Sequence, residues 1–359
     1  MLKDGTHGTH KDADNGPYLL SAKNIKDGHI IIDETTDRKI SISEFEQIHS
    51  KFKLQKGDVL LTIVGSIGES AILENPSNLT FQRSVAFLRP NSTVTSSFLR
   101  TTIESSGFQK ELQDRKSQSA QPGVYLGELE KIPVSVPSLK EQEQIGSFFT
   151  ELDDIITLHQ RKLESMKLLK KSLLQKMFPK SGETVPEVRF PGFADAWEQR
   201  KLGDICKITM GQSPDGKTYS EKPSDYILVQ GNADLKNGWV VPRIWTTHMT
   251  KKGDAGDLIM SVRAPAGAMG KTAYDVVLGR GVAAIKGNEF IFQTLVKMDS
   301  DRYWKKIAAG STFESINSDA VKNAELLIPS IQEQTKIGCF FTLLDQTITL
   351  HQRELFCRS

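Results

Sequence analysis

Residues 137–163 read PSLKEQEQIGSFFTELDDIITLHQRKL, and residues 329–355 read PSIQEQTKIGCFFTLLDQTITLHQREL. The two stretches share the Pro-Ser opening, the Phe-Phe-Thr centre and the Ile-Thr-Leu-His-Gln-Arg ending. Their spacing of about 190 residues is far longer than a solenoid repeat and indicates a duplicated unit made of a domain plus a helix. A chain built this way should handle two similar ligands, or two halves of one.

Each repeated stretch begins as a helix does. Ser138 and Ser330 stand three residues before a glutamate, the capping-box pattern in which the serine accepts a backbone amide and the glutamate reaches back. Apolar residues then recur three and four apart, as in a coiled-coil seam. The residues expected to pack the helices are Ile145, Phe149, Leu152, Ile156, Leu163, Met166, Leu173, Met177, Ile337, Phe341, Leu344 and Ile348. About 39 residues of helix would be roughly 58 Å long, which suits a spacer, and the second copy should pack on the first antiparallel.

The segments between the helices are also repeated, with more divergence. They are rich in predicted strands and loops. The matching pairs are a Gly-Asp turn before an apolar strand in 56–64 and 255–262, the segments 83–86 and 280–283, and the segments 18–20 with Asn24 and 226–228 with Asn232. Matching helices with divergent globular parts indicate one scaffold that presents two specificities.

Composition excludes several classes of protein. There are 46 basic and 44 acidic residues, so the net charge of +2 neither requires nor excludes a nucleic-acid partner, although residues 161–180 are locally basic. Three cysteines without close pairing provide no disulfide framework and no Cys-x-x-Cys zinc site, so we expect a reducing compartment. The first residues are polar and no run of 18 apolar residues occurs, which predicts no membrane partner and a cytoplasmic location.

The sequence resembles the specificity subunit of type I restriction-modification systems over essentially its whole length. The segments that carry the resemblance are Pro186–Phe193 leading into Trp197–Asp204, the helix openings, Leu168–Phe178 and Asp4–His7. The resemblance implies an α/β (α+β) fold with two similar target-recognition domains separated by long antiparallel coiled-coil helices, related by a pseudo-twofold duplication.

That resemblance also implies a division of labour. The chain would be a DNA-binding subunit that is no enzyme and binds no cofactor. S-adenosylmethionine, ATP and Mg would be bound by its partners, the methyltransferase subunits docked on the helices and a restriction and motor subunit. No Asn/Asp-Pro-Pro-Tyr/Phe sequence of the amino-methylases occurs in the chain. The expected boundaries are a first recognition domain at 1–137, a spacer helix at 138–180, a second recognition domain at 181–329 and a second spacer helix at 330–359.

Double-stranded DNA would be contacted by loop residues with suitable side chains. Arginine and lysine bind guanine and phosphate, asparagine and glutamine bind adenine, and short polar groups bind phosphate. The candidates in the first domain are His7, Lys11, Lys23, Asn24, Gln82, Arg83, Gln118 and Gln121. The candidates in the second domain are Gln212, Ser213, Lys217, Gln230, Asn232, Arg263 and Arg280. For Arg83 and Arg280, a structural salt bridge is an equal alternative.

Three further patterns have a structural and a functional interpretation. Residues 267–272 are similar to the end of a phosphate-binding loop, but Pro265 stands where that motif needs glycine, which favours a turn between strands. His7 and His10 would suit a metal ion, DNA or no ligand at all. His159 and His351 occupy equivalent helix positions, where they either pair and fix the helix register or act as single satisfied histidines.

Both ends of the sequence depart from the family pattern. Alignment through Tyr18 and Tyr226 places Met1 opposite Thr209, so the first domain begins late, and the second helix stops early compared with the first. The first half of the spacer helix would then lose partners, at about 1.5 to 3 kcal/mol for each buried apolar side chain. The alternatives to a working subunit are a truncated copy that donates recognition domains by recombination and, with less support, a self-contained DNA-modifying enzyme.

Overall fold

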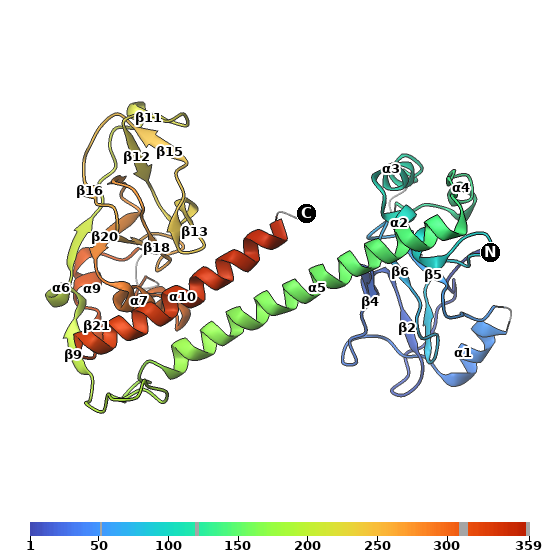
Figure 1. The fold of residues 1–359 in the computed structure, drawn as a ribbon, viewed down its shortest axis with the longest axis horizontal. Helices are drawn as coiled ribbons and strands as arrows, with labels where there is room; N and C mark the ends of the chain where they lie inside the picture. The colour runs from blue at the N-terminus through green and yellow to red at the C-terminus, as the bar shows by residue number, and fades with distance from the viewer. Residues whose placement is uncertain (51, 119–121, 309–314, 357–359) are drawn as a thin grey trace. The chain divides into compact units, whose positions relative to one another are not determined.

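The computed structural model describes residues 1–50, 52–118, 122–308 and 315–356, with side chains as far as Arg353. It divides into two compact units, Met1–Leu158 and His159–Ser359 (Figure 1). The helix α5 (Leu139–Lys176) contributes its first half to unit 1 and its second half to unit 2, and α10 (Ile331–Phe356) belongs to unit 2.

Unit 1 is built on a four-stranded antiparallel sheet in the order β1, β8, β5, β6. The central strand β5 has the sequence Val-Leu-Leu-Thr and is buried at every position, so both faces of the sheet are covered. The strands are β1 (Leu2–Asp4), β5 (Val59–Thr62), β6 (Ser70–Ile72), β8 (Val85–Leu88), the parallel pair β2 (Tyr18–Leu20) and β7 (Leu79–Phe81), and the pair β3 (Ile25–Lys26) and β4 (His29–Ile30). The helices are η1 (Ala22–Asn24), α1 (Ile42–His49), α2 (Ser96–Glu104), α3 (Ser106–Asp114) and α4 (Leu126–Leu129).

Unit 2 repeats this plan with more strands. Its main sheet has the order β10, β20, β17, β18, β14, β13, and a second sheet has the order β11, β15, β12, β19, β16. The strands are β9 (Glu198–Lys201), β10 (Lys207–Met210), β11 (Tyr219–Ser220), β12 (Tyr226–Val229), β13 (Leu235–Lys236), β14 (Trp239–Val240), β15 (Ile244–Thr246), β16 (Lys252–Gly253), β17 (Leu258–Ser261), β18 (Met269–Lys271), β19 (Val276–Leu278), β20 (Val282–Lys286) and β21 (Glu325–Ile328). The helices are η2 (Gly216–Thr218), η3 (Asn232–Asp234), α6 (Leu202–Ile205), α7 (Glu289–Ser300), α8 (Tyr303–Ala308) and α9 (Ser318–Lys322).

The two Gly-Asp turns have the same construction. Gly57 and Gly256 have φ values of 90° and 92°, a conformation that favours glycine. Each following aspartate is buried and accepts the backbone amide three residues before it, at 2.8 Å for Asp58 and 2.9 Å for Asp257. Arg89 also holds Asp58 through two hydrogen bonds of 2.7 and 2.8 Å. A buried carboxylate of this kind fixes the direction in which the central strand leaves the turn.

Strand register corrects part of the alignment made from the sequence. Leu2 lies opposite Leu88 in unit 1, and Ile208 lies opposite Ile285 in unit 2. The strand β1 is therefore the counterpart of β10, and Met1 corresponds to Lys207 rather than to Thr209. The alignment through the two tyrosines therefore placed Met1 two residues too late, because the loops that follow the first strand differ in length. Strand register also matches Leu20 with Val229 rather than with Leu228, so the tyrosines themselves differ by one position.

In unit 2, α10 packs antiparallel on the second half of α5 (Figure 1). The rings of His159 and His351 contact each other with centroids 6.1 Å apart, and the ammonium of Lys170 lies 2.6 Å from the carboxylate of Asp345. Among the predicted packing residues, Leu163, Met177, Ile337, Phe341 and Ile348 are buried, and Ile145, Leu152, Ile156, Met166, Leu173 and Leu344 are partly buried. Phe149 departs from the expectation and remains 42% exposed.

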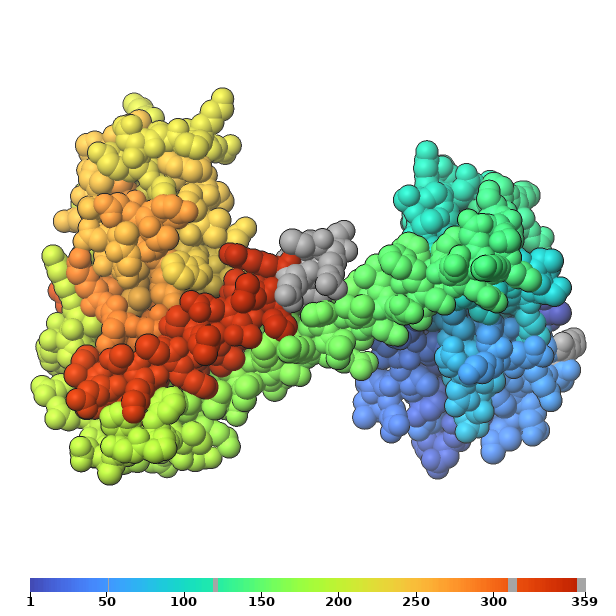
Figure 2. Space-filling view, viewed as in Figure 1, coloured from blue at the N-terminus to red at the C-terminus, as the bar shows by residue number. Residues whose placement is uncertain are grey.

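The linker that follows α5 folds back onto the start of α10, as the yellow-green segment beneath α10 in Figure 2 shows. Both Nε and Nη2 of Arg189 donate to the carboxylate of Glu333, at 2.7 and 2.8 Å. Glu333 is 1% exposed. Its carboxylate accepts hydrogen bonds from Arg189 instead of from the start of its own helix. Of the expected capping box only the serine half forms, with the Glu333 amide donating to Ser330 Oγ at 3.4 Å.

We predict that Glu333→Gln lowers the free energy of unfolding of unit 2 by about 3 kcal/mol, because it leaves the buried guanidinium of Arg189 without its counter-charge. All four tryptophans lie between Trp197 and Trp304, so urea denaturation followed by tryptophan fluorescence reports on this unit alone. The matched control is Glu221→Gln at an exposed glutamate of the same unit, which should change stability by less than about 0.5 kcal/mol. Equal effects of the two substitutions would contradict the prediction.

Candidate nucleic-acid interface

In unit 1, three segments meet where β1 leaves the main sheet. The Gly5 amide donates to Val85 O and the Thr6 amide to Phe81 O, both at 2.9 Å. The Arg83 amide returns a hydrogen bond to Thr6 O at 3.0 Å. The loop that starts at Gly5 is thereby tied to the turn that joins β7 to β8 and carries Arg83.

Unit 2 has the same hydrogen bonds at the corresponding place. The Gly211 amide donates to Val282 O at 2.9 Å and the Gln212 amide to Leu278 O at 2.8 Å. The Arg280 amide donates to the Ser213 hydroxyl at 3.0 Å, so a side chain here replaces the backbone acceptor of unit 1. The backbone scaffold of the edge is thus duplicated, while the side chains on it differ.

Glycine is needed at the first residue of each loop for lack of space. A Cβ on Gly5 would lie 2.2 Å from Phe81 O, and a Cβ on Gly211 would lie 2.0 Å from Gly279 O. These neighbours are backbone atoms of the sheet, so they cannot move aside. The loop therefore leaves the sheet in close contact with the arginine turn in both units.

The arginines of these turns are available to a ligand. Arg83, Arg263 and Arg280 are exposed, and within the described ranges none of them forms a salt bridge or a side-chain hydrogen bond. The structural salt bridge that the sequence left open for Arg83 and Arg280 is not formed. Arg263 lies on the turn between β17 and β18, where its backbone forms an isolated antiparallel β-bridge with Ser315. Guanidinium groups in this position suit guanine edges and phosphates.

Beside Arg83 the structure adds a tyrosine that the sequence did not single out. A cavity of about 180 Å³ is lined by Asp4, His7, Arg83, Ser117 and Tyr125, among others. Tyr125 is 66% exposed, and His7 Nε2 lies 2.6 Å from Asp4 Oδ2. An exposed aromatic ring next to a cation is a surface on which a base can stack. The only signal in the sequence was an aromatic residue in a glycine-containing loop, which is too common to be informative.

No support for a metal at His7 and His10 appears in the described ranges, which contain no group of three or more metal-ligating side chains. His10 Nε2 lies 2.7 Å from the hydroxyl of Thr6, and its Nδ1 lies 3.5 Å from Glu44. The two histidines thus have different protein partners, and His10 is a structural residue of the loop.

Asn24 was a poor candidate, because it is 4% exposed and its amide is used inside the domain. Its Oδ1 accepts from the Ser21 amide at 3.0 Å, and its Nδ2 donates to Ile31 O and to Asp37. Its counterpart in unit 2 is Asp234 rather than Asn232, since Asp234 accepts from the Gly231 amide in the same 3-10 turn. Lys23 is 60% exposed but bonded to Asp37 at 2.7 Å. Burial acts to raise the pKa of Asp37, and the bond from Lys23 helps to hold that pKa below its usual value.

The other predicted contacts divide by position. Ser213, Gln230 and Arg280 are brought together. The Arg280 amide donates to the Ser213 hydroxyl, and Gly281, the next residue, is so close to Gln230 that a Cβ on it would lie 2.0 Å from Gln230 O. Lys11, Gln118, Gln212 and Lys217 are exposed, and Gln82 and Asn232 are partly buried. Gln121 lies outside the described residues.

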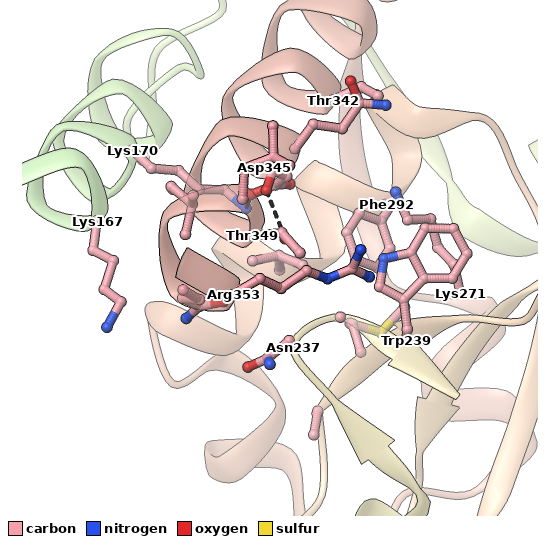
Figure 3. Close-up of a pocket in the computed structure, with 18 of the residues that line it drawn as sticks. Lys167, Lys170, Asn237, Trp239, Lys271, Phe292, Thr342, Asp345, Thr349 and Arg353 are labelled. Carbon is pink, nitrogen blue, oxygen red and sulfur yellow. Dashed lines mark hydrogen bonds and ion pairs between the residues drawn. The ribbon is translucent and has the colours of Figure 1, made fainter. Parts of the chain in front are cut away.

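A cavity of about 850 Å³ lies elsewhere in unit 2 (Figure 3). Its three lysines have partners: Lys271 is bonded to Glu289 at 2.9 Å and lies over the rings of Trp239 and Phe292, Lys170 is bonded to Asp345, and Lys167 is bonded to Glu164. Lys271 also belongs to the segment 267–272, which is similar to the end of a phosphate-binding loop. That segment is a turn and the strand β18, as expected, so its amides serve the sheet rather than a phosphate.

Three comparisons relate the chain to known proteins. The family model described as type I restriction modification DNA specificity domain matches residues 10–168 and 194–355. A putative type I restriction enzyme MjaX specificity subunit from Methanocaldococcus jannaschii is 26% identical over 363 residues, which cover 93% of this chain and 85% of the relative. The type I restriction enzyme EcoBI specificity subunit from Escherichia coli is 29% identical over 172 residues, which cover 46% of this chain and 36% of the relative.

The fold is likewise similar to solved structures. The type I restriction-modification S subunit from M. genitalium has a TM-score of 0.64 at 14% identity, covering 100% of this chain and 90% of that one. At these identities the likeness concerns the fold. No helix in the described part of the chain is long and apolar enough to cross a membrane.

We predict that Gly211→Val displaces the loop after β10, because the new side chain would meet Gly279 O. Hydrogen exchange at the amides of Gln212 and Arg280 should rise by roughly tenfold or more as their hydrogen bonds are lost. Gly216→Ala is the control, since nothing lies within 4 Å of a Cβ at that position. Unchanged exchange in the Gly211→Val variant would show that the loop is not held in the way described.

Proposed function

Because the chain belongs to the type I restriction modification DNA specificity family, we propose that each of its two units reads one half of a bipartite DNA target. Specificity subunits recognise DNA and do not catalyse the reaction. In this proposal the methyltransferase subunits dock on α5 and α10, and a restriction and motor subunit completes the complex. S-adenosylmethionine, ATP and Mg belong to those partners.

One observation carries the proposal: the same hydrogen-bonded edge occurs twice, with an exposed arginine at the equivalent position of each copy that forms no salt bridge with any described residue. Arg83 and Arg280 therefore act in separate half-sites. The neighbouring side chains differ, with His7 and Tyr125 near Arg83 and with Ser213 and Gln230 near Arg280. Equivalent backbones with different side chains are what two different half-sites require.

The experiment is to co-express the chain with its methyltransferase subunit in a host without adenine methylation and to map methylated adenines across the genome. A single bipartite motif is expected. Arg83→Ala should weaken or relax one half-site only and Arg280→Ala the other, each by about tenfold to a hundredfold in discrimination, since a bidentate arginine–guanine contact is worth about 1 to 3 kcal/mol. Arg200→Ala, at an exposed arginine of β9, serves as the control.

Loss of both half-sites from either substitution alone, with the soluble complex retained, would contradict the proposal that the two units recognise their half-sites independently. Methylation by the purified chain alone would contradict the assignment as a recognition subunit. Salt dependence gives a second readout, because an arginine that contacts phosphate contributes to the salt slope without changing the motif.

We further propose that α5 sets the spacing between the half-sites. Insertion of seven helix-forming residues between Leu158 and His159 adds two turns, or about 10.5 Å, which corresponds to about 3 base pairs. This position precedes His159, the residue that meets α10 at His351, so the described helix packing is kept. The methylation map should show unchanged half-sites with a longer spacer. The same insertion between Thr35 and Thr36, in an exposed loop, should leave the spacer unchanged, and altered half-sites in the helix variant would refute the proposal.

A further inference from the structure

The sheet edge of unit 2 carries a second arginine beside Arg280. Strand β17 runs antiparallel to β20, and beyond the end of β17 the Val262 amide donates to Gly281 O at 2.8 Å. The next pair in this register is Arg263 and Arg280, so the two arginines stand just beyond the ends of neighbouring strands. Both are exposed, and neither forms a salt bridge or a side-chain hydrogen bond with a described residue.

Unit 1 has the same backbone at this place but a different side chain. The Ile63 amide donates to Ser84 O at 2.9 Å. The next pair in the register of β5 and β8 is Val64 and Arg83, so Val64 is the counterpart of Arg263. Val64 is partly buried and lines the same cavity as Arg83. One edge therefore carries two guanidinium groups, and the other carries one guanidinium group beside an apolar side chain.

The match extends to the segment that crosses this edge in each unit. The Val124 amide donates to Ile63 O in unit 1, and the Ile316 amide donates to Val262 O in unit 2, both at 2.9 Å. A short helix follows at once, α4 in unit 1 and α9 in unit 2. The backbone that positions the residue opposite the arginine is therefore equivalent in the two units, and its side chain is what differs.

The two side chains favour different bases. Neighbouring guanidinium groups repel each other, because like charges directly opposite on paired strands are destabilising. A ligand with acceptors for both groups offsets this repulsion. Guanine presents two acceptors, O6 and N7, in an arrangement that the arginine fork matches. A valine can make only an apolar contact, which favours the methyl group of thymine.

We propose that Arg263 and Val64 each set one base of the half-site that their unit reads. Arg263 binds a guanine next to the one bound by Arg280. Val64 contacts the methyl group of a thymine next to the guanine bound by Arg83. This inference rests on the proposed function and deepens it, because it names the bases that distinguish the two half-sites.

The first test is the methylation map of the co-expressed complex with Arg263→Val, which gives unit 2 the side chain of unit 1. Discrimination at one guanine of the half-site that Arg280→Ala affects should fall by about tenfold or more, with the other half-site unchanged. Weaker methylation with an unchanged motif would overturn the proposal, since Arg263 would then contact phosphate. Arg200→Val, the same change at the exposed arginine of β9, should leave the motif as it is.

The second test changes single atoms of the DNA, so it does not depend on the stability of a variant. A fluorescent duplex with the mapped motif carries 7-deazaguanine at the guanine assigned to Arg263, and its binding to the complex is measured by anisotropy. Affinity should fall about fivefold or more for the unaltered complex and less than about twofold for the Arg263→Val complex, which no longer uses N7. Equal losses in the two complexes would overturn the proposal.

Deoxyuridine in place of thymidine tests Val64 in the same assay. Loss of the thymine methyl group at the assigned position should lower affinity about threefold, as loss of one buried methyl group does. The same replacement in the spacer of the motif should have no effect. A bipartite motif without two neighbouring guanines in the half-site of unit 2, or without that thymine in the half-site of unit 1, would overturn this inference alone. A map without any bipartite motif would overturn the proposed function as well.

Discussion

The packing of the linker and α10 on the end of α5 is the contact on which unit 2 depends. The Arg189–Glu333 ion pair joins the linker to α10, Phe190 beside Arg189 packs on Phe340, and the carboxylate of Glu333 is almost fully buried. A buried ion pair of this kind contributes little net stability over a hydrophobic substitute, but it is costly to break, and its bidentate geometry admits one arrangement. It therefore fixes the point at which the chain turns from the spacer helix into the second domain.

The two sheet edges that carry Arg83 and Arg280 depend on a different constraint, which is close contact between backbones. Gly5 and Gly211 have no room for a side chain, and hydrogen bonds to the sheet hold the residue that follows each of them. Since those bonds join backbone atoms, the side chains of the loops can vary without loss of the scaffold. The replacement of a backbone acceptor in unit 1 by the Ser213 hydroxyl in unit 2 is one such variation.

The duplicated scaffold was predictable from the sequence because its determinants are local. The serine caps, the two Gly-Asp turns and the apolar period of the helices each involve residues within a few positions of one another. The alignment of the loops was not predictable, because strand register matches Leu20 with Val229 rather than with Leu228 and one further residue stands at Gln230, and together these make Asp234, and not Asn232, the counterpart of Asn24. The pairing of Arg189 with Glu333 was also out of reach, since it joins residues far apart in the chain through the tertiary fold.

The same distinction explains which candidate contacts survived. Asn24 has the right chemistry for adenine, yet a small polar residue beside a 3-10 turn satisfies backbone groups first, and its burial removes it from any ligand. Arg83 and Arg280 remain candidates because, within the described residues, neither guanidinium forms a salt bridge or a side-chain hydrogen bond. Residue type identifies side chains that are able to bind DNA. Whether a side chain remains available depends on the hydrogen-bond and ion-pair partners that the folded protein places beside it.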